Sequence, residues 1–142
     1  MAHINILKLC VGATSVEDLL DWQRSQRAHW PAGTAVHVTR MWPKREAEVT
    51  GGGSLYWVIK GVVLARQRIL RLEEYAGQDG IRRCALVLDA SVVRTEAALR
   101  RPFQGWRYLD PADSPRDLPT GRALEQPLPD ALALALAEIG LR

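Results

Sequence analysis

Hydrophobic and polar positions alternate with a period of two in several short stretches of the chain, as is typical of β-strands. Residues 4–12 and 35–42 are two such stretches, and the second places Arg40 and Trp42 on the same face of its strand. Between them, residues 15–28 repeat apolar side chains at helical spacing, with acidic residues at the start and arginines at the end. The pattern therefore predicts a strand, a helix and a second strand, in that order.

Three consecutive glycines at 51–53 precede the most apolar and β-branched stretch of the chain. Residues 54–60 are predicted to form a central strand, and the glycines before it predict a tight turn or a close approach of two backbone segments. Pro43 suits the first position of a helix, so one or two helical turns are expected between it and the glycines.

The pattern leaves residues 62–75 open between two structures, because their apolar positions satisfy both a helical stripe and a strand. The turn-forming residues 77–80 lead directly to an apolar run at 81–88, which favours a long β-hairpin. Residues 91–95 are predicted to be extended or to form a single turn, and residues 96–101 to form a loop.

The C-terminal part combines a short strand, a loop and a helix. Residues 106–109 predict the strand, and the prolines within 110–128 predict a loop that wraps the domain. Residues 129–140 begin with proline and an acid and stop at glycine, which are the usual limits of a helix. Leucines cover most of this helix, so it is expected to dock on its own domain or to form a homodimer with a second copy. We expect one domain over residues 1–142.

Composition limits the class of protein. The chain has 142 residues, of which 47% are hydrophobic, so it can bury a single core. No apolar run reaches the roughly 20 residues that cross a bilayer, and the first residues lack the charged leader of a signal peptide. We therefore expect a cytoplasmic protein with no membrane partner. Cys10 and Cys84 lack the paired spacing of a metal or redox site, so we expect buried thiols, no metal and no cofactor.

Arginine greatly outnumbers lysine in this chain. Of the 19 lysine and arginine residues, only Lys8, Lys44 and Lys60 are lysines, and the formal net charge is +3. The planar guanidinium group binds phosphate at two points and stacks on rings, which an ammonium group does not do. The ratio therefore favours recognition of anions or nucleic acid, although a GC-rich genome that replaces lysine by arginine throughout would produce the same ratio.

Cationic and aromatic side chains recur in three segments, and we expect these segments to form one cleft that binds RNA or a nucleotide-like ligand. The segments are 42–45, the central strand and 104–108. A base stacked on a tryptophan contributes ~1–3 kcal/mol, and each neutralised phosphate adds a salt-sensitive increment. The alternative is that the tryptophans pack in the core and the arginines form a solvated face. The candidate binding residues are Arg40, Trp42, Lys44, Arg45, Trp57, Lys60, Arg66, Arg68, Gln104, Trp106 and Arg107.

Two other functions stay open. One is hydrolysis of a modified nucleoside or another small molecule, with Lys60 as base or nucleophile. The carboxylates that would lie beside it are Glu46, Glu48 or Asp89. No spacing in the sequence requires catalysis, so no catalytic residue is assigned. The other function is that of a protein-interaction module without a ligand.

Several tryptophan-rich strings resemble a bacterial, alphaproteobacterial-type family known as domain of unknown function 1489. The resemblance covers roughly residues 5–118 and implies no activity. The strings that carry it are TRMWPKR at 39–45, GGSLYWVIKG at 52–61, RQRIL at 66–70, RRCALVLD at 82–89 and FQGWRYL at 103–109.

The order of the predicted elements is more distantly similar to the PUA-like barrels, including the ASCH and EVE groups, which are associated with RNA or modified bases. This similarity implies an α/β (α+β) fold, a mostly antiparallel β-barrel with an N-terminal helix and a docked C-terminal helix. In the ASCH pattern a glycine-lysine element lines the binding cleft, and the nearest positions here are Gly53 and Lys60. Tyr56 and Trp57 replace the glutamate-x-arginine of that pattern, so no catalytic role is carried over.

Overall fold

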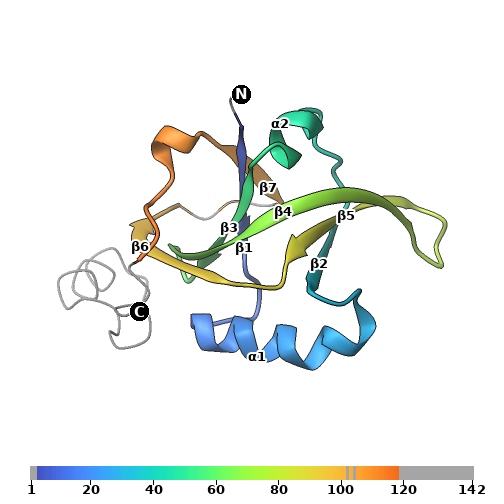
Figure 1. The fold of residues 1–142 in the computed structure, drawn as a ribbon, viewed down its shortest axis with the longest axis horizontal. Coiled ribbons are helices and arrows are strands. Elements are labelled where there is room, and N and C mark those ends of the chain that lie inside the picture. The colour runs from blue at the N-terminus through green and yellow to red at the C-terminus, as the bar shows by residue number, and fades with distance from the viewer. Residues whose placement is uncertain (1–2, 102, 104, 119–142) are drawn as a thin grey trace.

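The computed structural model describes residues 3–101, 103 and 105–118. The predicted helix at 129–140 and its dimer contact, most of the predicted loop and the candidate residue Gln104 lie outside the described residues. The described chain has an α+β fold, in which a seven-stranded mixed sheet carries short helices at its two ends (Figure 1). No helix in these ranges is long and apolar enough to span a membrane.

The elements follow one another along the chain with short connections. The strands are β1 (Asn5–Leu9), β2 (Thr34–Thr39), β3 (Ser54–Ile59), β4 (Val62–Ala76), β5 (Arg82–Asp89), β6 (Val93–Leu99) and β7 (Trp106–Leu109). The helical elements are α1 (Val16–Gln26), η1 (Arg27–His29), α2 (Glu46–Thr50) and η2 (Pro111–Asp113).

The long strand β4 belongs to both halves of the sheet. Its first half pairs with β3 and β6, and its second half pairs with β5, with a register shift between Ile69 and Arg71. The strand order is β2-β5-β4-β3-β1-β7, and only β1 and β3 run parallel to each other. The sheet is thus mostly antiparallel, as predicted, but it is not closed into a barrel, because β2 and β7 do not pair. These edges approach each other where Trp106 Nε1 donates to the Met41 carbonyl oxygen at 3.0 Å.

The side-chain amide of Gln67, in the middle of β4, forms hydrogen bonds through both its oxygen and its nitrogen. The side chain of Gln67 is fully buried, and its Oε1 accepts from Trp57 Nε1 and from Gln23 Nε2, both at 2.8 Å. Its Nε2 donates to Gln23 Oε1 at 2.9 Å and to the Asp89 carbonyl at 3.0 Å. This network ties α1 to β3, β4 and the end of β5. Because side chains alternate along a strand, the two arginines beside Gln67 lie on the opposite face of the sheet.

The glycine turn brings the start of β1 against α2. Gly53 lies so close to other backbone that an added Cβ would overlap the carbonyl oxygens of Ile4 and Val49. The backbone N–H of Gly53 donates to the Val49 carbonyl at 3.0 Å, and that of Ile4 donates to the Glu48 carbonyl at 3.2 Å. The predicted close approach of two backbone segments is therefore confirmed.

Most predicted elements are present, including the helix after β1, the central strand and the long hairpin of β4 and β5. Strand is therefore the correct choice for residues 62–75. The extended conformation predicted within 91–95 is confirmed, but the loop predicted for 96–101 is wrong, because β6 continues to Leu99. Besides pairing with β4, this strand forms an antiparallel bridge between Thr95 and Asp117, and its polar side chains hide the period of two. The N-cap of α1 is Ser15, whose Oγ accepts from the Asp18 backbone N–H at 3.1 Å, so the helix begins within the predicted range of 15–28.

Replacing Gln67 with leucine is expected to lower the free energy of unfolding by about 3 kcal/mol or more, because the groups that bond to its amide would lose buried partners. Urea unfolding followed by tryptophan fluorescence measures the change. Gln78→Leu, at an exposed position in the β4–β5 turn, is the matched control and should change stability by less than about 0.5 kcal/mol. Similar losses in both variants would contradict an anchoring role for Gln67.

Candidate functional site

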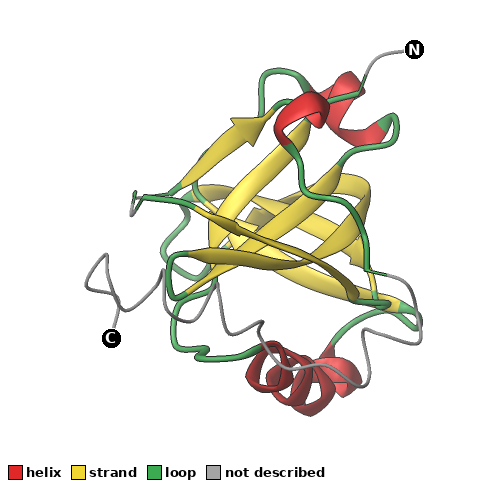
Figure 2. Cartoon of the chain, turned by 90° about the vertical axis from the view of Figure 1, so that its left-hand side faces the viewer, coloured by secondary structure: helices red, strands yellow, loops and turns green. Residues whose placement is uncertain are grey.

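Two of the concavities on the described surface lie at opposite ends of the sheet. We call the first the outer groove; its volume is about 530 Å³, and it lies on the outer face of β1, β3 and β4 beneath residues 111–117. We call the second the inner cavity; its volume is about 390 Å³, and it lies between the end of β1, α1, β2 and β3. Figures 1 and 2 show α1 at the end of the sheet that holds the inner cavity, and the N-terminus at the other end.

The floor of the outer groove is built by strand register. Ser54 and Tyr56 of β3 are the cross-strand partners of Arg68 and Arg66 on β4, so these four side chains share the outer face. Asn5 of β1 joins them, since its Oδ1 accepts from the Ser54 backbone N–H at 2.9 Å. Burial raises the pKa of the Tyr56 hydroxyl, which therefore stays protonated at neutral pH. The floor is thus rich in hydrogen-bonding groups and buried at its base.

One ion pair fastens the covering segment to this floor. Arg66 Nε and Nη2 donate to the two carboxylate oxygens of Asp117 at 2.7 and 2.6 Å, and Nη1 donates to Ser54 Oγ at 3.0 Å. The guanidinium group holds the pKa of the Asp117 carboxyl below its usual value. Asn5 Nδ2 also donates to Ser114 Oγ at 2.8 Å. The backbone of the segment pairs with β6, because the Glu96 N–H donates to the Arg116 carbonyl at 2.7 Å and the Leu118 N–H donates to the Arg94 carbonyl at 2.9 Å.

The outer groove carries an excess of positive charge. Arg68 and Arg116 line it, are exposed, and form no ion pair with any residue in the described ranges. With Arg66 they place three guanidinium groups around one carboxylate, that of Asp117, which leaves a formal charge of +2 with His3 neutral. Such a groove can hold a ligand with two or more negative charges.

The inner cavity is different in character, because most of its wall is apolar. The His37 ring meets the Trp57 indole edge to face, with 5.3 Å between centroids. Burial and the charge of Lys8 lower the pKa of His37 to about 4, so the imidazole is neutral at pH 7. Burial raises the pKa of the Cys10 thiol to about 11, so this thiol is protonated and is not a nucleophile at neutral pH. Cys10 and Cys84 are both free thiols.

The eleven candidate residues do not form one cleft. Arg66 and Arg68 line the outer groove, and Trp57 lines the inner cavity. Gln104 lies outside the described residues. The others line neither concavity, and they are Arg40, Trp42, Lys44, Arg45, Lys60, Trp106 and Arg107.

The three candidate tryptophans do not form an open stacking platform. Trp57 and Trp106 are 3% and 5% exposed, and their indole N–H groups are bonded to Gln67 and to the Met41 carbonyl. Trp42 is half-buried and donates to Glu46 Oε1 at 3.0 Å. Trp57 and Trp106 therefore belong to the core, whereas Trp42 packs against it with the Arg82 guanidinium carbon 5.1 Å from its ring centroid.

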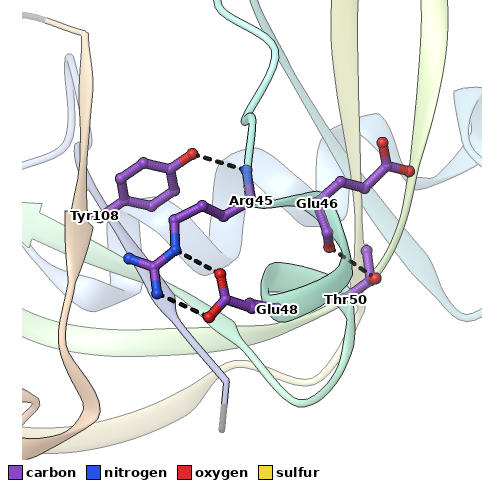
Figure 3. A network of polar contacts seen from close by, with 5 residues as sticks. All are labelled: Arg45, Glu46, Glu48, Thr50 and Tyr108. Carbon is purple, nitrogen blue, oxygen red and sulfur yellow. Dashed lines mark hydrogen bonds and ion pairs between the residues drawn. The ribbon is translucent and has the colours of Figure 1, made fainter.

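The cations near α2 and the β3–β4 turn are not arranged for hydrolysis. Arg45 Nη2 donates to Glu48 at 2.8 Å, and the Arg45 backbone N–H donates to Tyr108 Oη at 3.2 Å (Figure 3). Asp89 Oδ1 accepts from the Ser91 backbone N–H at 2.8 Å. Lys60 is exposed in its turn and pairs with no carboxylate of the described chain. The alternative of a Lys60 base beside one of these carboxylates therefore has no support in the geometry.

Sequence reasoning missed groove residues from segments far from β3 in the sequence, such as Asn5 and Arg116. Nothing local marks them, because Asn5 is brought to the groove by the parallel pairing of β1 with β3, and Arg116 by the backbone pairing of residues 116–118 with β6 and the ion pair at Asp117. One local signal did exist for the inner cavity. The alternation of β1 places Lys8 on the face that carries Ile6, which is unusual for a lysine.

The family model described as "Protein of unknown function (DUF1489)" matches residues 6–142 of the chain. No curated protein and no solved structure matches this chain. The resemblance carried by the tryptophan-rich strings is therefore confirmed.

Substituting His37 is expected to flatten the pH dependence of stability. Because the folded pKa of about 4 lies below the ordinary value of 6.5, the unfolded chain binds the proton more readily, and stability is lost as the pH falls across this window. In urea unfolding, the wild type should lose about 3 kcal/mol more than His37→Gln between pH 7 and pH 4. The exposed His29→Gln is the control and should follow the wild type. Parallel curves for wild type and His37→Gln would show that His37 is not buried as a neutral ring.

Proposed function

We propose that this chain, which belongs to the DUF1489 family, binds single-stranded RNA through the phosphates, with the outer groove as the contact surface. The observation that carries the proposal is the set of three guanidinium groups around one carboxylate, over a floor of hydroxyl and amide groups. A free nucleotide shares this phosphate chemistry, and the experiment below separates the two ligands.

The arginines of the outer groove differ in how they are held. Arg66 is fixed by Asp117 and Ser54, so it loses little conformational freedom when it contacts a phosphate. Arg68 and Arg116 are exposed and have free guanidinium forks on two sides of the groove. Two-point contacts from such groups to phosphate oxygens are stronger than neutral hydrogen bonds. Together they support binding of a phosphate chain that passes between β4 and the 111–117 segment.

The proposed binding is electrostatic and tolerant of base sequence. Trp57 and Trp106 are buried, so stacking on tryptophan does not contribute. Phosphate contacts position a nucleic acid without reading its bases, and they make affinity depend steeply on salt. A cytoplasmic location, where RNA is abundant, belongs to the same proposal.

A distant kinship with the PUA-like domains is also part of the proposal. Its support is the order of elements: strand, short helix after Pro43, glycine turn, strand and long hairpin. The open sheet and the exposed Lys60 depart from that pattern. The RNA proposal rests on the outer groove and not on this kinship.

Arg68→Gln with Arg116→Gln is expected to weaken binding of a fluorescently labelled twelve-nucleotide oligo(U) by about tenfold or more at low salt, because two phosphate contacts are lost. The plot of log affinity against log salt should become shallower by about 1.4, at ~0.7 for each single-strand phosphate contact. Fluorescence anisotropy measures both quantities. Asp117→Asn removes the carboxylate of the groove and should strengthen binding.

The matched control is Arg24→Gln with Arg27→Gln, which removes the same charge at the opposite end of the sheet. This variant should bind oligo(U) nearly as the wild type does. Competition by uridine monophosphate at micromolar concentration would identify a nucleotide site in place of an RNA site. No saturable binding by the wild type at low salt, or equal losses in the two double variants, would overturn the proposal.

A further inference from the structure

The inner cavity is a second site whose polar groups the proposed function does not use. Its volume of about 390 Å³ falls within the range of ~300–1,000 Å³ that is usual for small-molecule sites. Leu19 and Trp57 form buried parts of the wall. Val11 and Trp22, which also line the cavity, are 87% and 51% exposed. Large apolar side chains left in water beside an apolar cavity form a surface suited to the entry of an apolar ligand.

The cationic side chain that lines the inner cavity is Lys8, which lies on the core-facing side of β1. Ile4 and Ile6 of the β1 segment belong to the main core, and the alternation of the strand puts Lys8 on the same face. Its cross-strand neighbours are Trp57 on β3 and Trp106 on β7, both buried. Among the residues that the structure describes, no carboxylate forms an ion pair with Lys8. Lys8 is half-buried. Removing an ammonium group partly from water without an anion costs solvation free energy, which a bound anion would offset.

A second polar group faces the cavity from β2. His37 lines it, and the Nε2 atom of His37 is buried with no hydrogen-bond partner among the described residues. The ring is neutral at pH 7, because burial and the nearby Lys8 disfavour its protonated form. A neutral imidazole can give or accept one hydrogen bond and adds no charge. The cavity therefore contains one cation and one neutral hydrogen-bonding group that have no partner within residues 3–101, 103 and 105–118.

We propose that the inner cavity binds a small organic monocarboxylate with a flat apolar body, whose carboxylate contacts the Lys8 ammonium group and the His37 imidazole. The apolar body lies against Trp57, Leu19 and the exposed ring of Trp22. One ammonium group matches one carboxylate, and the apolar wall leaves further charges without partners.

The other reactive groups of the cavity do not change this assignment. The carboxylate of Asp18 is exposed and accepts from Thr14 N at 2.9 Å and from Thr14 Oγ1 at 2.6 Å, so it is satisfied without Lys8. The Cys10 thiol is protonated at neutral pH, which makes the binding non-covalent. A phosphate ester would need several charged donors, and these lie in the outer groove and not here.

Isothermal titration of the full chain with 2-naphthoate tests the proposal, with 2-naphthamide as a probe of nearly the same shape and no charge. The wild type should bind 2-naphthoate saturably with a single site, and 2-naphthamide at least about tenfold more weakly. Lys8→Met keeps the length of the side chain, removes the ammonium group, and should weaken 2-naphthoate by about tenfold or more. His37→Phe should weaken it several-fold.

Two controls separate the site from the fold and from the outer groove. Lys8→Met should unfold at a higher urea concentration than the wild type, because it removes a cation without a partner, so its weak binding is not a loss of folding. It should also keep the oligo(U) affinity of the wild type. Lys44→Met, at an exposed position outside the cavity, should bind 2-naphthoate as the wild type does. No saturable binding by the wild type, equal binding of the two probes, or unchanged binding in Lys8→Met would overturn the proposal.

Discussion

The constraint on which both concavities depend is the buried amide of Gln67. Its oxygen and nitrogen each make two hydrogen bonds, to Trp57, Gln23 and the Asp89 carbonyl, so the group is fully satisfied without water. A satisfied polar group in a core specifies one arrangement, because any rotation of β4 would leave several buried groups without partners. The amide thus determines which side chains of β4 point inward. It also orients the Trp57 indole, which forms part of the wall of the inner cavity.

The same constraint places the arginines. With Gln67 directed into the core, Arg66 and Arg68 must lie on the outer face, where Ser54 and Tyr56 are their cross-strand partners. The direction of the Gln67 side chain therefore fixes which face of β4 belongs to the core and which face carries the arginines. The ion pair of Arg66 with Asp117 then adds the covering segment, so the outer groove is built by residues from both ends of the described chain.

Local periodicity in the sequence predicted what is local in the structure. Apolar and β-branched content identified β3, the turn residues 77–80 identified the β4–β5 hairpin, and the position of the glycines identified the close approach at Gly53. Local pattern failed for β6, whose polar side chains hide the period of two and whose backbone pairs with β4 and with residues 116–118. It also failed to group the candidate residues, because the pairing of β1 with β3 and the docking of residues 111–117 join segments far apart in sequence. Trp57 and Trp106 are residue types that often stack on bases, but both side chains are buried and cannot reach a ligand on the surface.

The two concavities differ in how their positive charges are compensated. In the outer groove, Arg66 is neutralised in part by Asp117, and the other arginines are solvated, so the free protein has little electrostatic strain there. In the inner cavity, Lys8 is half-buried, and no described carboxylate forms an ion pair with it, because Asp18, which also lines the cavity, bonds to Thr14. An apolar side chain of similar length would avoid the cost of removing an ammonium group partly from water without a partner. The proposed binding of a carboxylate therefore gives the lysine at this position a role that stability alone does not provide.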